Sequence, residues 1–210
     1  MISKNKTKLP RRSRAGAIAT ATAVAFAVAV GRGATAPAQP TTEEGADALR
    51  TELYGEWLEA ARNDDFIGVQ NYERVRYDAN GRLPPPADAR VNYMGAEIFA
   101  PSLGGAVRYA HRVTGIPVIV TEHGIGLAAE NEDDTLRAAF IPEALAGLKA
   151  AIDDGVPVKG YVHWSLLDNF EWIFGYRPRF GLVAVDRRTF ARKPKPSAAV
   201  YAAISQRNAL

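Results

Sequence analysis

The sequence has 210 residues and no cysteine. This absence excludes a disulfide scaffold, a thiolate nucleophile and any metal site built on sulfur ligands. Histidine is scarce as well, because the chain contains only His111, His123 and His163. Three scattered histidines are too few for a histidine-rich metal cluster, and we predict neither a bound metal nor a cofactor.

Acidic residues are absent from the first 40 positions, which distorts the overall charge. The chain has 26 basic and 23 acidic residues, giving a net charge of +3. Seven of the basic residues lie in residues 1–40, so the other 170 residues hold 19 basic and 23 acidic groups and carry a net charge of −4. A mildly acidic body offers no broad basic face, and we expect no nucleic-acid partner.

A hydrophobic run of membrane-spanning length is missing too. The uncharged stretch at residues 15–30 is shorter than the ~20 apolar residues that a spanning helix needs, so we expect no stable membrane span. A basic start, this short apolar stretch and the Arg11-Arg12 pair are typical of an export signal. The alternative is a leader that never folds, which leaves the location open between export (periplasmic or secreted) and the cytoplasm. In either case we assign residues 1–40 to a leader and expect residues 41–210 to form the folded part.

Hydrophobic periodicity in the first half of that part predicts helix, strand, loop and helix. Apolar residues at helical spacing predict an amphipathic helix over 46–62, and the apolar run that starts at Phe66 predicts a buried strand. The Asn-Gly pair and three prolines in residues 78–92 predict a loop. The next helix is expected to begin at Ser102 as its N-cap and to end at Gly115.

The second half repeats the alternation. Residues 117–120 predict a strand, and Asp133 or Asp134 is the expected cap of the helix that follows. A strand over 158–167 and a last helix over 197–208 complete the pattern. The helix after the cap is expected to turn these residues inward: Leu136, Phe140, Leu145, Leu148 and Ile152. Strands that alternate with helices predict an α/β fold with a parallel sheet.

The chemistry of parallel α/β folds lies at the carboxyl ends of the strands. In this sequence those ends carry Tyr72, Glu122 and the segment 164–169. A lone glutamate at a strand end is more often an ordinary surface residue. The motifs around Glu122 change that interpretation.

Three motifs resemble the family 1 glycoside hydrolases, the β-glucosidase family. They are TEHG at 121–124, GYVHWSLLDNFEW at 160–172 and GYRPRFGL at 175–182. Weaker similarity extends from Asp65 to the final helix, about two-thirds of the chain. The resemblance implies a (β/α)8 TIM barrel, of which this chain holds strands six to eight with their helices.

The resemblance also implies a function, retaining β-glycosidase activity on a β-linked glycoside or oligosaccharide. Glu122 takes the place of the catalytic nucleophile in the family's Thr-Glu-Asn-Gly motif, and Tyr72 that of the tyrosine that orients it. A carboxylate nucleophile fits cleavage in two displacements through a covalent glycosyl-enzyme.

The implied sugar-binding residues are Trp164, Glu171, Trp172, Phe180 and Gln70. The two indoles would cover apolar sugar faces, the carboxylate would accept hydroxyl groups, and the phenylalanine would line the same pocket. For the three aromatic residues, packing in the core is the alternative.

The sequence departs from the family pattern in three ways. His123 replaces the asparagine after the nucleophile, which we expect to alter the pocket rim, and Gln70-Asn71-Tyr72 replaces Asn-Tyr-Tyr. The family's Thr-x-Asn-Glu-Pro motif, which carries the acid/base glutamate, is absent, and Glu73 and Glu97 are the remaining candidates.

A whole barrel takes about 250 residues, and five further βα units do not fit before residue 66. We therefore expect the carboxyl-terminal part of a β-glycosidase, inactive alone and dependent on an N-terminal barrel half. The alternatives are a catalytically dead carbohydrate-binding remnant and a non-functional gene fragment.

Overall fold

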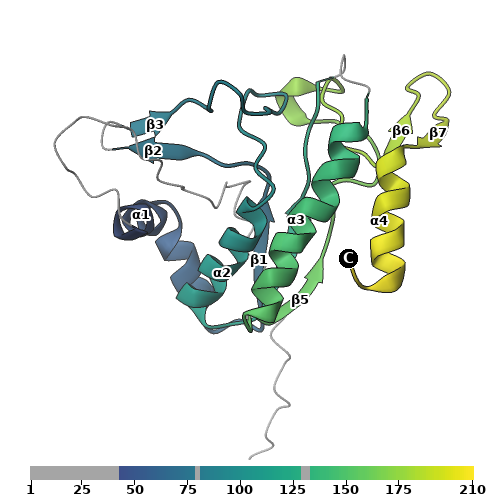
Figure 1. Cartoon of the computed structure of the whole chain (residues 1–210). Helices are drawn as coiled ribbons and strands as arrows, with labels where there is room; N and C mark the ends of the chain where they lie inside the picture. Colours follow the sequence, from purple (N-terminus) through teal and green to yellow (C-terminus); the bar gives the residue numbers. More distant parts are fainter. Residues whose placement is uncertain (1–42, 79–80, 129–132) are drawn as a thin grey trace, which may run out of the picture.

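The computed structural model describes residues 43–78, 81–128 and 133–210, and the predicted leader at 1–40 lies outside these ranges. The three strands of the central sheet are separated by helices along the described chain as expected (Figure 1). Within the described ranges, no helix is both long and apolar enough to cross a membrane. In chain order the elements are α1 (Glu43–Ala61), β1 (Ile67–Asn71), β2 (Arg76–Asp78), β3 (Gly81–Leu83), α2 (Ser102–Thr114), β4 (Val118–His123), α3 (Thr135–Asp153), β5 (Val158–Tyr161), the 3-10 helix η1 (Trp172–Phe174), β6 (Val183–Val185), β7 (Arg192–Pro194) and α4 (Pro196–Arg207).

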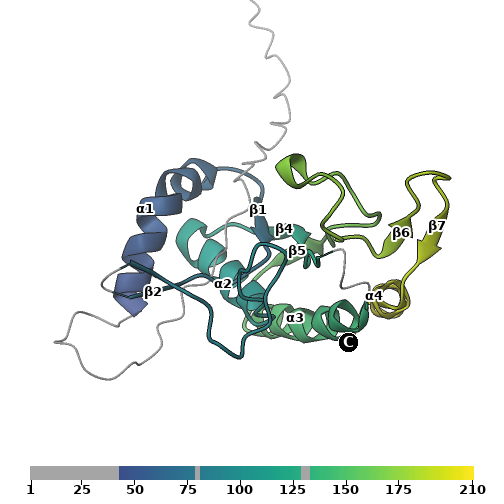
Figure 2. The same ribbon diagram turned by 90° about the horizontal axis from the view of Figure 1, so that it is seen from above.

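The central sheet is parallel and has the order β1-β4-β5, which is also the order of these strands in the sequence. Its helices α2 and α3 lie side by side along one face (Figure 2). Side chains that point toward these helices are buried, as Val69 and Val120 show with 1% and 0% exposure. Their neighbours on the other face, including Gln70 and Thr121, stay half-exposed. The predicted α/β fold is confirmed.

A large part of the core lies where α2 meets α3. Leu103 and Val107 of α2 and Ile141 and Ala144 of α3 are all fully buried. The two helices approach so closely at Gly104 that a Cβ atom there would lie 2.5 Å from the carbonyl oxygen of Gly147. Larger residues at this crossing would push the helices apart, so the glycine sets their separation.

The helix ends confirm some of the expected caps and correct others. Gly115 ends α2 in the left-handed conformation with φ of 75°, as predicted. Ser102 does not cap this helix, because its hydroxyl donates instead to Oδ1 of Asn71 at 2.8 Å. The Asp133 carboxylate accepts a hydrogen bond of 2.9 Å from the backbone N–H of Thr135, which is the first residue of α3. Ile152, expected to point inward, is 47% exposed near the end of that helix.

Short antiparallel pairs are the main difference from the predicted elements. Residues 81–83, assigned to a loop, form β3 and pair with β2, while β6 and β7 form a second hairpin that periodicity did not indicate. The predicted strand over 158–167 ends at Tyr161. Three-residue strands are too short to show an alternating pattern in the sequence. The apolar segment after β5, which was expected to continue the strand, adopts a loop conformation.

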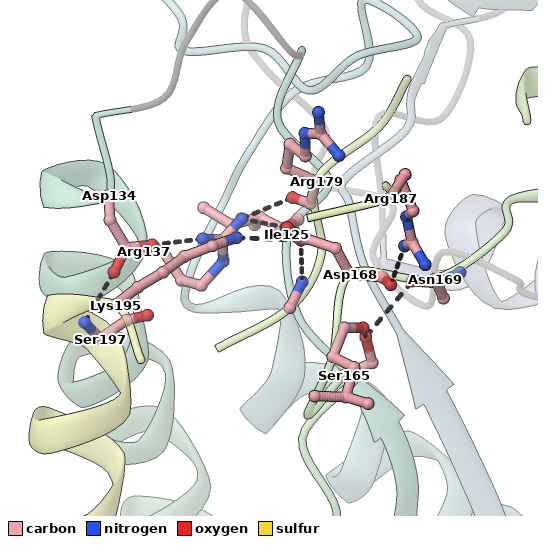
Figure 3. A network of polar contacts seen from close by, with 12 residues as sticks. Ile125, Asp134, Arg137, Ser165, Asp168, Asn169, Arg179, Arg187, Lys195 and Ser197 are labelled. Atoms are coloured by element: carbon pink, nitrogen blue, oxygen red, sulfur yellow. Dashed lines mark hydrogen bonds and ion pairs between the residues drawn. The ribbon is translucent and has the colours of Figure 1, made fainter. Parts of the chain in front are cut away.

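That long loop, residues 162–182, is held by a network around Arg137 of α3 (Figure 3). The Arg137 side chain is 1% exposed and forms an ion pair with Asp134. Its guanidinium also donates to the carbonyl oxygen of Arg179 at 2.5 Å. Asp134 in turn accepts the backbone N–H of Ser197 at 2.6 Å, which ties α4 to the same point. Burial lowers the pKa of Arg137, while the Asp134 carboxylate opposes this effect.

Asp168 provides a second anchor inside the long loop. Its carboxylate, 3% exposed, accepts the backbone N–H of Gly181 at 2.9 Å and the Lys195 ammonium at 2.9 Å. The contact with Gly181 joins Asp168 to the end of the loop, and the contact with Lys195 joins the loop to the start of α4. A segment with little regular secondary structure is therefore fixed by buried charge-assisted hydrogen bonds.

We expect Arg137→Met to lower the free energy of unfolding by about 3–5 kcal/mol, because it leaves the buried Asp134 carboxylate without its counter-charge. Urea denaturation followed by circular dichroism measures the change. Arg108→Met is the matched control, since the Arg108–Asp154 pair is exposed, with side chains 40% and 61% accessible. It should cost no more than about 1 kcal/mol. Equal losses in the two variants would contradict the role assigned to Arg137.

Candidate active site

Glu122 and Tyr72 meet at the carboxyl end of the parallel sheet. Glu122 lies near the end of β4, and Tyr72 directly follows β1. The Tyr72 hydroxyl donates to Oε2 of Glu122 at 2.6 Å. A register shift between Val69 and Gln70 places Gln70 opposite Glu122 in the β1–β4 pairing. Three of the residues predicted for the site therefore lie on neighbouring strands.

The electrostatics of this pair favour a stable donor and acceptor. Burial, followed by the neighbouring Glu122 carboxylate, raises the pKa of Tyr72 far above its ordinary value of 10. The phenol therefore keeps its proton around neutral pH and can donate to the carboxylate. A donor fixed in this way orients the carboxylate oxygen that accepts its hydrogen bond.

Phe180 packs behind Tyr72 rather than standing free in a pocket. Its side chain is 4% exposed, and its ring meets that of Tyr72 edge to face at 5.9 Å. A Cβ atom at Gly126 would lie 2.5 Å from the Phe180 ring, so this glycine makes room for it. The ring restricts the movement of the tyrosine that holds Glu122.

Tyr93 is a residue of this region that the sequence analysis did not single out. Its ring meets Phe180 edge to face at 5.6 Å and Phe174 at 5.0 Å. Burial and the nearby carboxylates of Glu171 and Glu73 raise the pKa of Tyr93 to about 12. An aromatic residue at the end of a proline-rich loop was the only signal in the sequence, and such a signal does not separate packing from function.

The other predicted sugar-binding residues lie in the long loop. Trp164 is half-buried, and its backbone N–H donates to the carbonyl oxygen of His123 at 2.9 Å. Oε2 of Glu171 accepts Nδ2 of Asn169 at 2.8 Å. Trp172 is 80% exposed, so the alternative of core packing is wrong for this indole. Phe180 is buried, as the alternative of core packing expects.

His123 does not lie on the pocket rim, and that expectation is wrong. The side chain is fully buried on the helix-facing side of the sheet, where its ring stacks on Phe140 of α3 at 5.1 Å. The β1–β4 pairing passes from Val69 and Val120 directly to Gln70 and Glu122, so Thr121 is skipped at an irregularity. Beyond this irregularity Glu122 stays on the half-exposed face, and its neighbour His123 points to the opposite, helix-facing side.

The two alternative acids have other partners. Glu97 is 5% exposed and pairs with Arg74 through two hydrogen bonds, one of them 2.8 Å long. Glu73 accepts the side-chain amide of Asn92 at 2.7 Å. Over the described residues, no group of three or more potential ligands could hold a metal ion.

Comparison with known proteins decides the family. The model of the family described as "Glycosyl hydrolase family 1" matches residues 94–210. The chain belongs to glycosyl hydrolase family 1. Among curated members, it is 38% identical to a beta-galactosidase of Pyrococcus woesei over 62% of this chain and 24% of that protein. It is 36% identical to a beta-glucosidase of Agrobacterium over 67% of this chain and 34% of that protein.

Comparison with solved structures of family members supports the same family assignment. The beta-glycosidase BGL167 superimposes with a TM-score of 0.72 and 45% identity, covering 80% of this chain and 39% of that one. A hyperthermophilic beta-glucosidase from Pyrococcus furiosus gives a TM-score of 0.72 with 29% identity, covering 80% and 38%. The chain thus spans between a quarter and two fifths of the length of these family 1 relatives.

Two buried histidines should make stability depend on pH. Burial and the neighbouring His163 lower the pKa of His123 to about 3. Burial and the Arg137 guanidinium lower the pKa of His163 to about 4, against the opposing effect of Asp134. Both histidines are therefore neutral in the folded protein at pH values where the unfolded chain already binds protons.

We expect the free energy of unfolding to be independent of these histidines above about pH 6.5 and to fall as the pH is lowered toward 4. Carboxylates titrate in the same range, so the informative quantity is the difference between wild type and His123→Asn. Urea denaturation at several pH values measures it. Removing one group should make the slope shallower by up to about 1.4 kcal/mol per pH unit. Parallel curves for the two proteins would contradict the assignment.

Proposed function

We propose that this chain supplies the nucleophile part of the active site of a retaining β-glycosidase of the β-glucosidase type. The observation that carries the proposal is the 2.6 Å hydrogen bond between Tyr72 and Glu122 at the carboxyl ends of adjacent parallel strands. A carboxylate there has a fixed donor on one oxygen and a second oxygen for attack. The relatives that are named beta-glucosidase and beta-galactosidase support a β-linked glycoside as the substrate.

In this proposal Glu122 is the nucleophile. Its free oxygen attacks the anomeric carbon while the bond to the leaving-group oxygen breaks, that oxygen takes a proton from the acid/base carboxyl group, and the sugar becomes an acylal ester of the glutamate. Water then attacks the same carbon, gives its proton back to the acid/base carboxylate and releases the carboxylate of Glu122. Tyr72 keeps the carboxylate oriented in both steps, because its phenol remains protonated.

Residues of the long loop and of β1 would bind the sugar. The exposed indole of Trp172 and the half-buried one of Trp164 offer flat apolar faces to a pyranose ring. The Glu171 carboxylate, oriented by Asn169, would accept hydroxyl groups, and Gln70 would add an amide next to Glu122. Phe180 would contribute indirectly, because its ring packs against Tyr72 and restricts the movement of that side chain.

A retaining site needs a second carboxyl group about 5–5.5 Å from the first. Glu97 does not fit this role, because the Arg74 guanidinium holds it in a buried ion pair. We propose that the acid/base glutamate comes from an N-terminal barrel half on another polypeptide segment. The half-exposed face of the sheet around Gln70 and Thr121 supports this, since a closed barrel would cover it. The described sheet would then form strands six to eight of the barrel.

The purified chain should not hydrolyse an aryl β-glucoside measurably. Without acid assistance alone, the rate should fall by about 10²–10⁴-fold relative to a complete enzyme. Co-expression with the N-terminal half of a family 1 β-glucosidase should restore turnover, and Glu122→Gln in the same complex should abolish it. Turnover by the isolated chain that requires Glu122 would show that a replacement acid lies within it. Sugar binding without turnover in the complex would favour a carbohydrate-binding remnant.

In the complemented enzyme a 2-fluoroglycoside should label Glu122, since slow breakdown traps the glycosyl-enzyme. Mass spectrometry of peptides locates the label. Glu122→Ala should lose nearly all activity and be partly rescued by azide, which fills the vacated space. Tyr72→Phe should lose roughly 10- to 100-fold, the value of one hydrogen bond to a charged group. Glu73→Gln is the matched carboxylate control and should retain labelling; label on Glu73 or Glu171 would overturn the assignment.

A further inference from the structure

A buried hydrogen-bonded chain crosses from β4 to the end of β5 on the helix-facing side of the sheet. Nδ1 of His123 lies 2.8 Å from the Tyr161 hydroxyl, which lies 3.0 Å from Nδ1 of His163. His123 is 0% exposed and His163 is 7% exposed. We call these three residues the histidine bridge.

One proton fixes the state of the whole bridge. The Tyr161 hydroxyl can donate to one Nδ1 atom and must accept a hydrogen from the other. With both rings neutral, one histidine therefore carries its proton on Nδ1 and the other on Nε2. A bridge of this kind specifies both tautomers and the orientation of both rings.

The bridge ends beside two residues of the proposed active site. His123 directly follows Glu122, and His163 directly precedes Trp164. The same strand ends are also joined through the backbone, where the N–H of Trp164 donates to the carbonyl oxygen of His123 at 2.9 Å. Movement at either histidine would therefore be transmitted to Glu122 or to Trp164.

Stability alone does not account for the bridge. Across the described part of the chain, the Nε2 atoms of both His123 and His163 are buried without a hydrogen-bond partner. A buried polar atom without a partner costs free energy, and apolar residues of similar shape would avoid that cost. Buried polar groups that are kept despite such a cost specify one arrangement among several.

We propose that His123, Tyr161 and His163 are positioning residues that hold the nucleophile Glu122 and the tryptophan Trp164 at a fixed separation. The proposal rests on the proposed function for its catalytic meaning. The claim that the bridge fixes the positions of the two strand ends does not depend on turnover, and it can be tested on the full chain.

The decisive variant is Tyr161→Phe, which removes only the central hydroxyl. Amide hydrogen exchange by NMR should show the Trp164 N–H exchanging at least about tenfold faster relative to Val107, a fully buried residue of α2 that reports global opening. A merely destabilised protein would change both rates together. Tyr201→Phe is the matched control, because its ring lies beside Tyr161 at 6.1 Å and beside His163 at 5.6 Å without belonging to the bridge. It should leave the ratio unchanged.

The wild-type chain provides a test that does not depend on any variant folding. Imidazole nitrogen NMR should show one of the two buried histidines protonated on Nδ1 and the other on Nε2. Two histidines in the same tautomer, or no slowly exchanging imidazole N–H, would overturn the proposal, as would an unchanged Trp164 ratio in Tyr161→Phe. His123→Asn, which keeps a hydrogen-bonding group near the place of Nδ1, should preserve Trp164 protection, whereas His123→Leu should lose it.

The complemented enzyme gives the catalytic readout. Tyr161→Phe should lower kcat by roughly three- to tenfold, the value of one neutral hydrogen bond, and Tyr201→Phe should match wild type. An inactive wild-type complex would refute the proposed function, while the exchange and tautomer measurements would still decide the bridge. An active complex with the same kcat in Tyr161→Phe would refute the positioning role.

Discussion

The buried guanidinium of Arg137 is the contact on which the candidate active site depends. Every proposed sugar-binding residue except Gln70 lies in the long loop, which contains only one short helix and no strand. Arg137 binds the loop through the carbonyl oxygen of Arg179, while its partner Asp134 binds the start of α4. A bidentate cation can join three segments in this way, because guanidinium donors point in several fixed directions. The loop gains a defined shape without a strand ladder.

The two faces of the sheet have different tasks. Glu122 and Gln70 lie on the half-exposed face, and Tyr72 at the end of β1 reaches the same carboxylate. The opposite face carries apolar residues and the histidine bridge against α3 and α4. Glu122 and Gln70 are thereby kept accessible, while the residues of the histidine bridge are largely buried. Burial strengthens the hydrogen bonds within the bridge.

The proposed nucleophile half of the active site is well organised in this chain. Glu122, the proposed nucleophile, has Tyr72 as its hydrogen-bond donor, Tyr72 packs against Phe180, and the strand ends are joined by backbone and side-chain contacts. None of these contacts needs the acid/base residue, since a general acid acts from the other side of the scissile bond. This explains how a nucleophile half can be ordered while the complete reaction needs a further carboxyl group.

Apolar periodicity in the sequence was enough to indicate the parallel α/β fold, and the long contiguous motifs were enough to indicate the family. The pairing of Tyr72 with Glu122 was expected only through the resemblance to that family, and the structure shows their hydrogen bond. Tertiary structure alone decided the direction of His123, since the register shift between β1 and β4 and the packing of α3 set which face a strand-end residue takes. It also diverted the Ser102 hydroxyl to Asn71 and placed Tyr93 against Phe180. Contacts between residues far apart in the chain leave no local periodicity, so only the folded structure could show them.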